Sequence, residues 1–313
     1  MKVCVLGAGA LGCAIGGTLA EAGSEVWLIN RSKVHVEAIN REGLLMRHAD
    51  GERTVRVQAS TDCHGIGPAD LVIVLVKSFD TRSAIEAAAP IVGEQTVVLS
   101  LQNGLGHEDI LAEVVGRERV LAGKTYVGGV MLGPGHIVAG TRGKHTHIGE
   151  LDGSISPRVQ RIAAEFERAG LATTVSPNIL GTMWDKLLIN VATGALSGIT
   201  GLTYGPLYSV PEIEQTALTA VAEAMAVARA SGIRLSMQAP RQAWEMASAG
   251  LPPDFKTSML QSLEKGSVTE IDFINGSVVR WGEKCGVPTP VNRTLVAAIK
   301  GIEHRMKQGA QAA

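Results

Sequence analysis

The sequence predicts an α/β domain over residues 1–176 followed by an all-helical domain over residues 177–313. In the first part, short apolar runs alternate with helical stretches, which is the pattern of a mostly parallel sheet covered by helices. In the second part, apolar residues recur at spacings of three and four, as they do over residues 213–232 and 268–282. Because 313 residues can form more than one core, we expect two domains of different class.

The α/β domain opens with one strand–helix–strand unit. An apolar strand over residues 2–6 is followed by glycines, by a helix over residues 10–22 and by a second strand over residues 25–29. The later elements follow in order: strands over residues 69–76, 96–101 and 120–130, a helix over 81–91, and a Gly-rich meander of short strands over 135–150.

A glycine-rich turn, Gly7-Ala8-Gly9-Ala10-Leu11-Gly12, joins the first strand to the first helix. The first glycine permits the tight turn, the second lets the backbone approach a pyrophosphate, and the third allows close packing of helix on strand. The amides that open the helix then face the phosphates. This context predicts a Rossmann-type dinucleotide-binding domain, with a tight turn that binds no ligand as the alternative. The expected cofactor contacts are Gly7, Gly9, Ala10, Leu11 and Gly12.

The residues that follow the second strand indicate which dinucleotide binds. A carboxylate there would hydrogen-bond to a ribose 2′-hydroxyl and favour NAD, but the sequence reads Asn30-Arg31-Ser32. Arg31 can pair with a 2′-phosphate, and Asn30 and Ser32 can add hydrogen bonds. We therefore expect NADP (NADPH) as the cofactor; an ordinary surface arginine is the alternative interpretation.

Two further polar residues follow predicted strands, and two more share a helix face. Lys77 and Asn103 come after strands whose carboxyl ends form the edge where open α/β sheets bind ligands. Lys186 and Asn190 stand four residues apart on a helix expected over residues 179–192. A desolvated lysine can donate a proton near neutral pH, and reduction of a ketone by hydride needs such a donor. The alternatives are that Lys77 simply reaches solvent and that Asn103 belongs to a simple turn. For Lys186 and Asn190, the alternative is a solvated face of an amphipathic helix.

Composition and charge exclude several classes of protein. The formal net charge is −1 and aromatic residues make up 4%, so we expect no nucleic acid and no anionic membrane as a partner. Glycines interrupt the apolar N-terminal stretch, which therefore predicts neither a signal peptide nor a membrane helix. Four cysteines fit no zinc or disulfide pattern, which favours the cytoplasm. His145 and His147 lack a third ligand at suitable spacing, so no metal site is expected.

Five motifs together resemble a known family. They are Gly-Ala-Gly-Ala-Leu-Gly at 7–12, Lys77 at a strand end, Gln102-Asn103-Gly104, Trp184-Asp185-Lys186-Leu187 with Asn190, and Ser258-Met259-Leu260-Gln261 followed by Thr269-Glu270-Ile271-Asp272. In order and spacing they resemble ketopantoate reductase (2-dehydropantoate 2-reductase), and the resemblance covers nearly the whole chain. It implies reduction of 2-dehydropantoate to pantoate with NADPH, in the pathway to pantothenate and coenzyme A.

The resemblance also implies a role for each matching residue. Lys186 would protonate the carbonyl oxygen, and Glu270 would hold a substrate hydroxyl and orient the lysine. Asn103 and Asn190 would hydrogen-bond to the substrate, and Asn103 would also lie at the cofactor. Ser258 would contact the substrate carboxylate, and Lys77 would approach the cofactor. From its own sequence context, Glu270 is only a carboxylate on an amphipathic helix.

The sequence departs from the family's best-known pattern at two substrate-binding positions. Gly194 stands where a second asparagine often follows the first, and Phe255 stands where an asparagine often precedes the serine. These departures put the identity of the 2-oxo acid in doubt. The alternatives are therefore a D-2-hydroxy-acid dehydrogenase for another 2-oxo acid and, from a different class, a catalytically silent NADP(H)-binding regulator. A homodimer is expected only because most oligomers are symmetric dimers.

Overall fold

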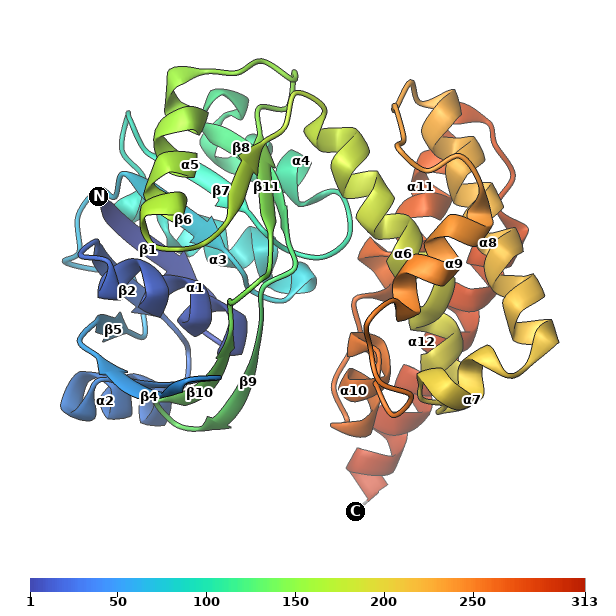
Figure 1. Ribbon diagram of the computed structural model, residues 1–313, viewed down its shortest axis with the longest axis horizontal. Coiled ribbons are helices and arrows are strands. Elements are labelled where there is room, and N and C mark those ends of the chain that lie inside the picture. Colours follow the sequence, from blue (N-terminus) through green and yellow to red (C-terminus); the bar gives the residue numbers. More distant parts are fainter. Residues whose placement is uncertain (313) are drawn as a thin grey trace. The chain divides into compact units, whose positions relative to one another are not determined.

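The computed structural model describes residues 1–312 and divides them into two compact units (Figure 1). The first unit contains Met1–Gln102 and His107–Ile179, and the second contains Asn103–Gly106 and the chain from Leu180 onward. The predicted order of an α/β part followed by a helical part is confirmed. The sequence does not predict that the short loop Asn103–Gly106 packs with the helical unit.

The first unit is built on an eight-stranded sheet with the order β12-β11-β8-β7-β6-β1-β2-β5. The six strands from β8 to β5 are parallel, and β11 runs antiparallel to β8. The central strands β6 and β7 are buried along their whole length, as expected for a parallel sheet covered on both faces. The strands are β1 (Lys2–Leu6), β2 (Glu25–Ile29), β5 (Gln58–Ser60), β6 (Leu71–Val74), β7 (Val97–Ser100), β8 (Val120–Thr125), β11 (Thr146–Gly149) and β12 (Thr173–Val175).

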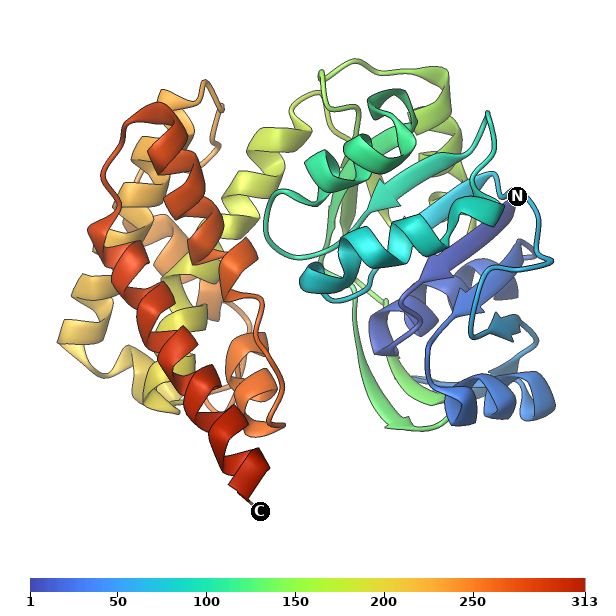
Figure 2. The same cartoon turned by 180° about the vertical axis from the view of Figure 1, so that it is seen from behind.

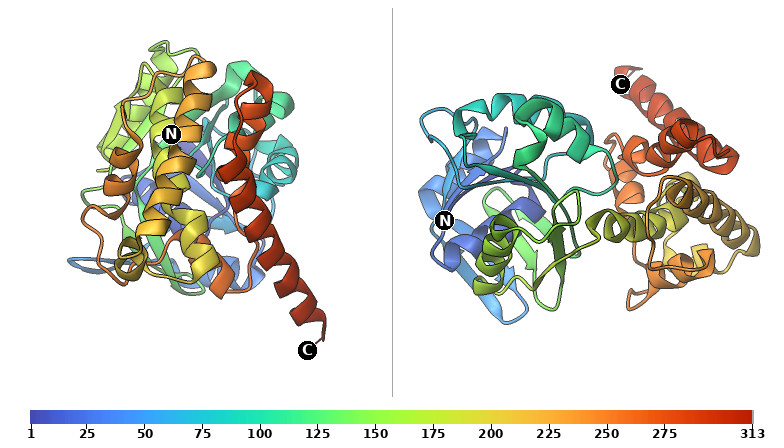
Figure 3. Two further views of the ribbon diagram at one scale, coloured as in Figure 1. Left: turned by 90° about the vertical axis from the view of Figure 1, so that its right-hand side faces the viewer. Right: turned by 90° about the horizontal axis from the view of Figure 1, so that it is seen from above.

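Helices cover both faces of this sheet (Figure 3, right). Helices α1 (Ala10–Glu21) and α5 (Pro157–Arg168) pack on one face through Ile15, Leu19 and Phe166. Helices α3 (Thr81–Ala87) and α4 (His107–Val115) cover the other face, which is turned to the viewer in Figure 2, through Ile85 and Leu111. Helix α2 (Lys33–Glu42) follows β2, and short 3-10 turns stand at Ser78–Asp80 (η1), Ala89–Ile91 (η2) and Arg117–Arg119 (η3).

A second, four-stranded sheet is a feature that the sequence patterns do not predict. Its order is β4-β3-β10-β9, with β3 (Leu44–His48), β4 (Gly51–Val55), β9 (Gly128–Gly133) and β10 (His136–Gly140). The predicted single strand over residues 120–130 is wrong, because β8 and β9 belong to different sheets. The predicted meander over 135–150 is also wrong, since β10 pairs with β3 while β11 joins the main sheet.

Helix α1 is apolar on two sides because it contacts both sheets. A Cβ added at Gly16 would lie 2.6 Å from Leu28 Cδ2 on the main sheet. A Cβ added at Gly17 would lie 2.4 Å from Met46 Sδ on the small sheet. The adjacent glycines therefore let one helix pack closely between two layers, and a Cβ at either position would require the end of the Leu28 or Met46 side chain to shift.

From Leu180 onward, where the ribbon in Figure 1 is coloured yellow-green to red, the second unit is built of helices joined by loops. Glu223 of α8 fixes the start of α12, because its carboxylate accepts hydrogen bonds from Val291 N and Asn292 N at 2.9 and 3.0 Å. Its helices are α6 (Ile179–Thr200), α7 (Tyr204–Tyr208), α8 (Pro211–Ala230), α9 (Pro240–Ser248), α10 (Ser258–Glu264), α11 (Asn275–Cys285) and α12 (Pro290–Ala312), with a 3-10 turn η4 at Ile271–Phe273. Among the described helices, none is long and apolar enough to cross a bilayer.

The predicted single helix over residues 268–282 is wrong. The chain forms η4, then breaks at Ile274, whose φ of −102° and ψ of −98° are not helical, and resumes as α11. The segment before the break is held elsewhere: Thr269 donates from its backbone N–H and its hydroxyl to Glu303 of α12, both at 2.7 Å. A tertiary contact thus overrides the helical periodicity of this stretch, and Glu270 lies outside any α-helix.

Candidate active site

The glycine turn has the geometry that a bound pyrophosphate requires. Gly7 has φ +92°, and a Cβ there would lie 2.4 Å from Val76 N. A Cβ at Gly12 would lie 2.5 Å from Gly7 O, so helix α1 and the turn are in close contact. A Cβ at Gly9, by contrast, would meet no atom within 4 Å. Gly7 and Gly12 are therefore required by packing, whereas Gly9, the N-cap of α1, leaves open space where phosphate oxygens can approach the amides of Ala10 and Leu11.

Of the residues after β2, Asn30 and Ser32 hold the local backbone, whereas Arg31 is exposed. Asn30 donates from Nδ2 to Ala8 O at 2.7 Å and accepts from Ser32 N at 2.9 Å, so its side chain fixes the glycine turn. Ser32 caps helix α2 by accepting from His35 N. The Arg31 side chain is 86% exposed and pairs with Asp80 at 2.8 Å. The sequence context shows no carboxylate at this strand end, but the fold supplies one from η1.

Lys77 and Gln102 lie in the loops that follow two neighbouring strands. Strand β6 ends at Val74, earlier than predicted, so exposed Lys77 stands three residues beyond it, at the start of η1. Buried Gln102 joins the two loops by donating from Nε2 to Val76 O at 2.9 Å and to Thr81 Oγ1 at 2.8 Å. The Gln-Asn-Gly motif includes Gln102 but assigns it no role. The sequence signal that could have pointed to a role for Gln102 is its position directly before Asn103.

Within the second unit, the loop of Asn103 contacts the segment that carries Glu270. Leu105 N donates to Phe273 O at 2.9 Å. Gly104 has φ +94°, and a Cβ there would lie 2.3 Å from the same carbonyl oxygen. The glycine of the Gln-Asn-Gly motif thus permits a backbone contact between two segments that are 169 residues apart in sequence (273 minus 104). The fold brings together Asn103 and the turn that begins at Glu270.

Helix α6 carries Lys186 and Asn190, both partly exposed, on a helix whose neighbouring residues are buried. Trp184 is 1% exposed and packs edge-to-face on Trp281 of α11, with ring centroids 5.9 Å apart. Asp185 accepts from Ser236 N and Met237 N, which ties α6 to the loop before α9. The residues that flank Lys186 therefore hold its helix on two sides, and Trp184 is a core residue.

The two departures from the family's pattern lie in apolar surroundings. Gly194 is buried, and a Cβ there would lie 3.6 Å from Met259 Cε of α10. Phe255 packs on Tyr204 with ring centroids 5.0 Å apart, and its carbonyl accepts from Tyr204 N. A methionine methyl group therefore lies beside Gly194, and Phe255 forms an aromatic pair with Tyr204. Neither position carries an amide side chain.

Ser258 and Glu270 stand at the starts of short elements. Ser258 is exposed at the first residue of α10, behind the cap Thr257, which accepts from Leu260 N at 3.2 Å. Glu270 is partly exposed and precedes η4. Buried Glu303 anchors its neighbour Thr269, and Lys300 bridges Glu303 and Asp272. Sequence reasoning missed the contact between Thr269 and Glu303, because it joins separate elements.

His145 and His147 lie side by side, with ring centroids 4.8 Å apart. Burial, with the neighbouring Lys124 and His145, lowers the pKa of His147 to about 4. His145 is hydrogen-bonded to Thr174 at 2.7 Å. Over residues 1–312, no three histidine, cysteine, aspartate or glutamate side chains gather as metal ligands would.

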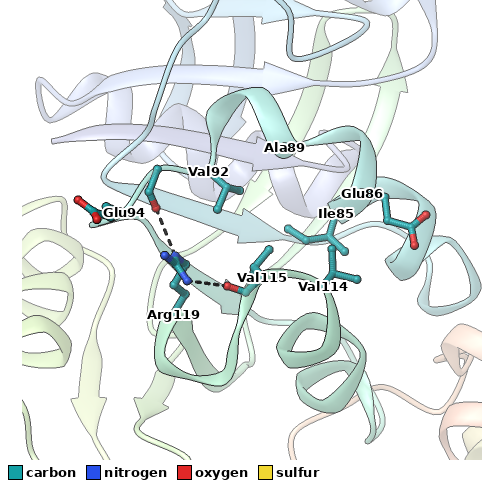
Figure 4. A pocket seen from close by; sticks show the side chains of 9 residues that line it. Ile85, Glu86, Ala89, Val92, Glu94, Val114, Val115 and Arg119 are labelled. Carbon is teal, nitrogen blue, oxygen red and sulfur yellow. Dashed lines mark hydrogen bonds between the residues drawn. The ribbon is translucent and has the colours of Figure 1, made fainter.

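A shallow hollow of about 330 Å³ lies between α3 and α4, away from these residues (Figure 4). Val92 and Arg119 line it just before β7 and β8 begin, at the amino edge of the sheet. Arg119 donates to Gly93 O and Val115 O, so its guanidinium serves the local backbone. Ligands of parallel sheets bind at the carboxyl edge, and this hollow is therefore not the catalytic site.

The glycine turn that follows β1 of a parallel sheet, together with the helical unit, defines a two-part dinucleotide-binding protein of Rossmann type. Comparison with known proteins then identifies the family. Residues 3–153 match the family model described as "Ketopantoate reductase PanE/ApbA", and residues 178–303 match the model of its C-terminal part. The chain belongs to the ketopantoate reductase family.

Full-length relatives support this assignment. The chain is 35% identical to a 2-dehydropantoate 2-reductase of Halobacterium salinarum, covering 96% of this chain and 98% of the relative. It is 38% identical to a PanE/ApbA family ketopantoate reductase from Ralstonia eutropha of known structure, with a TM-score of 0.90 over 98% of this chain and all of the other. A D-mandelate dehydrogenase solved with NADH and anilino(oxo)acetate also has a TM-score of 0.90, at 26% identity, covering 98% of this chain and all of the other.

Proposed function

We propose that this protein reduces 2-dehydropantoate to D-pantoate, with a hydride from NADPH and a proton from Lys186, in the synthesis of pantothenate and coenzyme A. The observation that carries the proposal is the similarity, over nearly the full length, to curated 2-dehydropantoate 2-reductases. The glycine turn supports the use of a dinucleotide independently, because Gly9 leaves space for a pyrophosphate while Gly7 and Gly12 are fixed by packing.

The proposed chemistry divides between the cofactor and the chain's own side chains. NADPH, when bound, supplies the hydride. Lys186 Nζ holds the proton that neutralises the charge developing on the substrate's carbonyl oxygen. Glu270 holds a substrate hydroxyl and orients the lysine, and Thr269, fixed by Glu303, positions that carboxylate. Asn103, Asn190 and Ser258 hold the substrate, with Ser258 at its carboxylate.

The cofactor contacts in this proposal are Gly7, Gly9, Ala10, Leu11, Gly12, Arg31, Lys77 and Asn103, with Asn30 acting by holding the turn. Four cysteines without a disulfide among them favour a reducing cytoplasm as its location. We expect neither nucleic acid nor membrane as a partner, and a homodimer as the assembly, which light scattering would test.

A panel of 2-oxo acids tests the proposal directly. Purified protein is mixed with NADPH and each acid, and oxidation of NADPH is followed by absorbance. We expect 2-dehydropantoate to give the highest kcat/KM of the panel. A substantially higher kcat/KM for an aryl or branched 2-oxo acid would instead favour a D-2-hydroxy-acid dehydrogenase, the second candidate. The apolar surroundings of Gly194 and Phe255 and the similarity to D-mandelate dehydrogenase favour that candidate. NADPH binding without turnover of any acid would indicate a silent regulator.

Replacement of Arg31 by alanine tests the choice of cofactor. The guanidinium is exposed and can meet a 2′-phosphate, a group that NADH lacks. We expect the Kd for NADPH to rise by about tenfold, as loss of a charge-assisted hydrogen bond predicts, and the Kd for NADH to change by less than about twofold. Fluorescence titration with each dinucleotide measures both. Equal losses for the two would contradict a role at the 2′-phosphate.

A further inference from the structure

Asp80 makes a contact that its position in the fold does not require. It stands at the N-cap of helix α3, where an aspartate ordinarily accepts a hydrogen bond from the first turn, yet its side chain makes no capping bond. Its carboxylate instead pairs with the Arg31 guanidinium at 2.8 Å, across 49 positions of sequence. The Asp80 side chain is 22% exposed, whereas the Arg31 side chain is 86% exposed.

The sheet explains how the two residues meet. Strand β1 lies between β2 and β6, and all three are parallel, so their carboxyl ends share one edge. Arg31 follows β2 and Asp80 follows β6, on either side of the glycine turn that follows β1. The Asp80 carboxylate therefore faces the Arg31 guanidinium at the edge of the sheet where a dinucleotide would bind.

We propose that Asp80 sets the dinucleotide preference of this protein, by competing with the 2′-phosphate for Arg31. This inference rests on the proposed use of NADPH. The Asp80 carboxylate occupies Nη2 of Arg31, so a 2′-phosphate must displace it to use that nitrogen. NADH carries no 2′-phosphate and displaces nothing. Asp80 thus weakens NADPH binding relative to NADH binding and narrows the preference for NADPH that Arg31 alone would give.

The substitution Asp80→Asn removes the charge and keeps the shape. Because the Asp80 side chain makes no capping bond, helix α3 should be retained. Because an exposed ion pair contributes at most about 1 kcal/mol, we expect the Kd for NADPH to fall by about two- to fivefold and the Kd for NADH to change by less than about twofold. Asp70→Asn is the matched control. It removes the same charge just before β6, at the opposite edge, where the residue accepts from Lys2 N at 2.8 Å. We expect Asp70→Asn to leave the preference unchanged.

A double variant tests whether Asp80 acts through the arginine. In an Arg31→Ala background, Asp80→Asn should change the Kd for NADPH by less than about twofold, because no guanidinium remains to be released. The full gain in that background would show that Asp80 does not act through Arg31 and would overturn the inference.

Binding is titrated on the full chain with no 2-oxo acid present, so the outcome does not depend on which acid is reduced. An unchanged or weaker NADPH affinity in Asp80→Asn, while the parent protein binds NADPH and reduces 2-dehydropantoate, would overturn this inference alone. A parent protein that binds neither dinucleotide would overturn the proposed function and the inference with it.

Discussion

Replacement of Lys186 by alanine should lower kcat by about 10²–10⁴-fold, the range expected when a general acid is lost. Hydride addition leaves negative charge on the substrate oxygen, and without a proton donor that charge must be met by water. Alanine is the best helix former, so α6 should be retained, and the buried neighbours Trp184 and Leu187 are untouched. Steady-state kinetics with 2-dehydropantoate measures the loss.

Two controls separate proton donation from other causes. Lys186→Arg keeps the positive charge but cannot give up a proton near neutral pH, so it should be nearly as slow as alanine. Lys307→Ala removes an exposed lysine of α12 and should leave kcat within about twofold of the parent. NADPH affinity should be unchanged in all three variants, because the glycine turn belongs to the other unit. Activity retained in Lys186→Ala would show that another group supplies the proton.

Gly7→Ala should lower the stability of the fold, whereas Gly9→Ala should weaken NADPH binding. Gly7→Ala places a Cβ 2.4 Å from Val76 N at φ +92°, so we expect the free energy of unfolding to fall by about 2–4 kcal/mol. Gly9→Ala places a Cβ in open space at φ −78°, a conformation that alanine adopts freely. We expect it to keep stability within about 0.5 kcal/mol of the parent and to weaken NADPH binding by about 10- to 100-fold.

Thermal unfolding and dinucleotide titration on the same samples measure these two effects. Addition of NADPH at about ten times the Kd of the parent should raise the Tm of the parent clearly and that of Gly9→Ala much less, since a weaker ligand stabilises the fold less at the same concentration. Undiminished NADPH binding by Gly9→Ala would contradict the placement of the pyrophosphate at this turn. Full stability of Gly7→Ala would contradict the close contact between the turn and the backbone that follows β6.

The elements predicted well are those whose signals lie close together in sequence. The turn at Gly7–Gly12 joins neighbouring elements and the motif itself marks it, although the backbone that Gly7 contacts, at Val76, follows a later strand. Helix α6 was predicted from its own periodicity, and the structure extends it to Thr200. The small sheet was missed because β3 pairs with β10, about ninety residues later, and no local pattern specifies such a partner.

Contacts of single residues are likewise hard to predict when their partners lie far away in the sequence. The sequence by itself determined the order of the two domains, the dinucleotide turn, and the residue types available for catalysis, because composition and periodicity carry that information. Only the tertiary structure decided that Glu270 leaves the helix through the contact of Thr269 with Glu303, that Gly104 lets the Asn103 loop contact Phe273, and that Asp80 reaches Arg31. Each of these contacts joins segments far apart in the chain, and the packing of the whole fold determines which such contacts form.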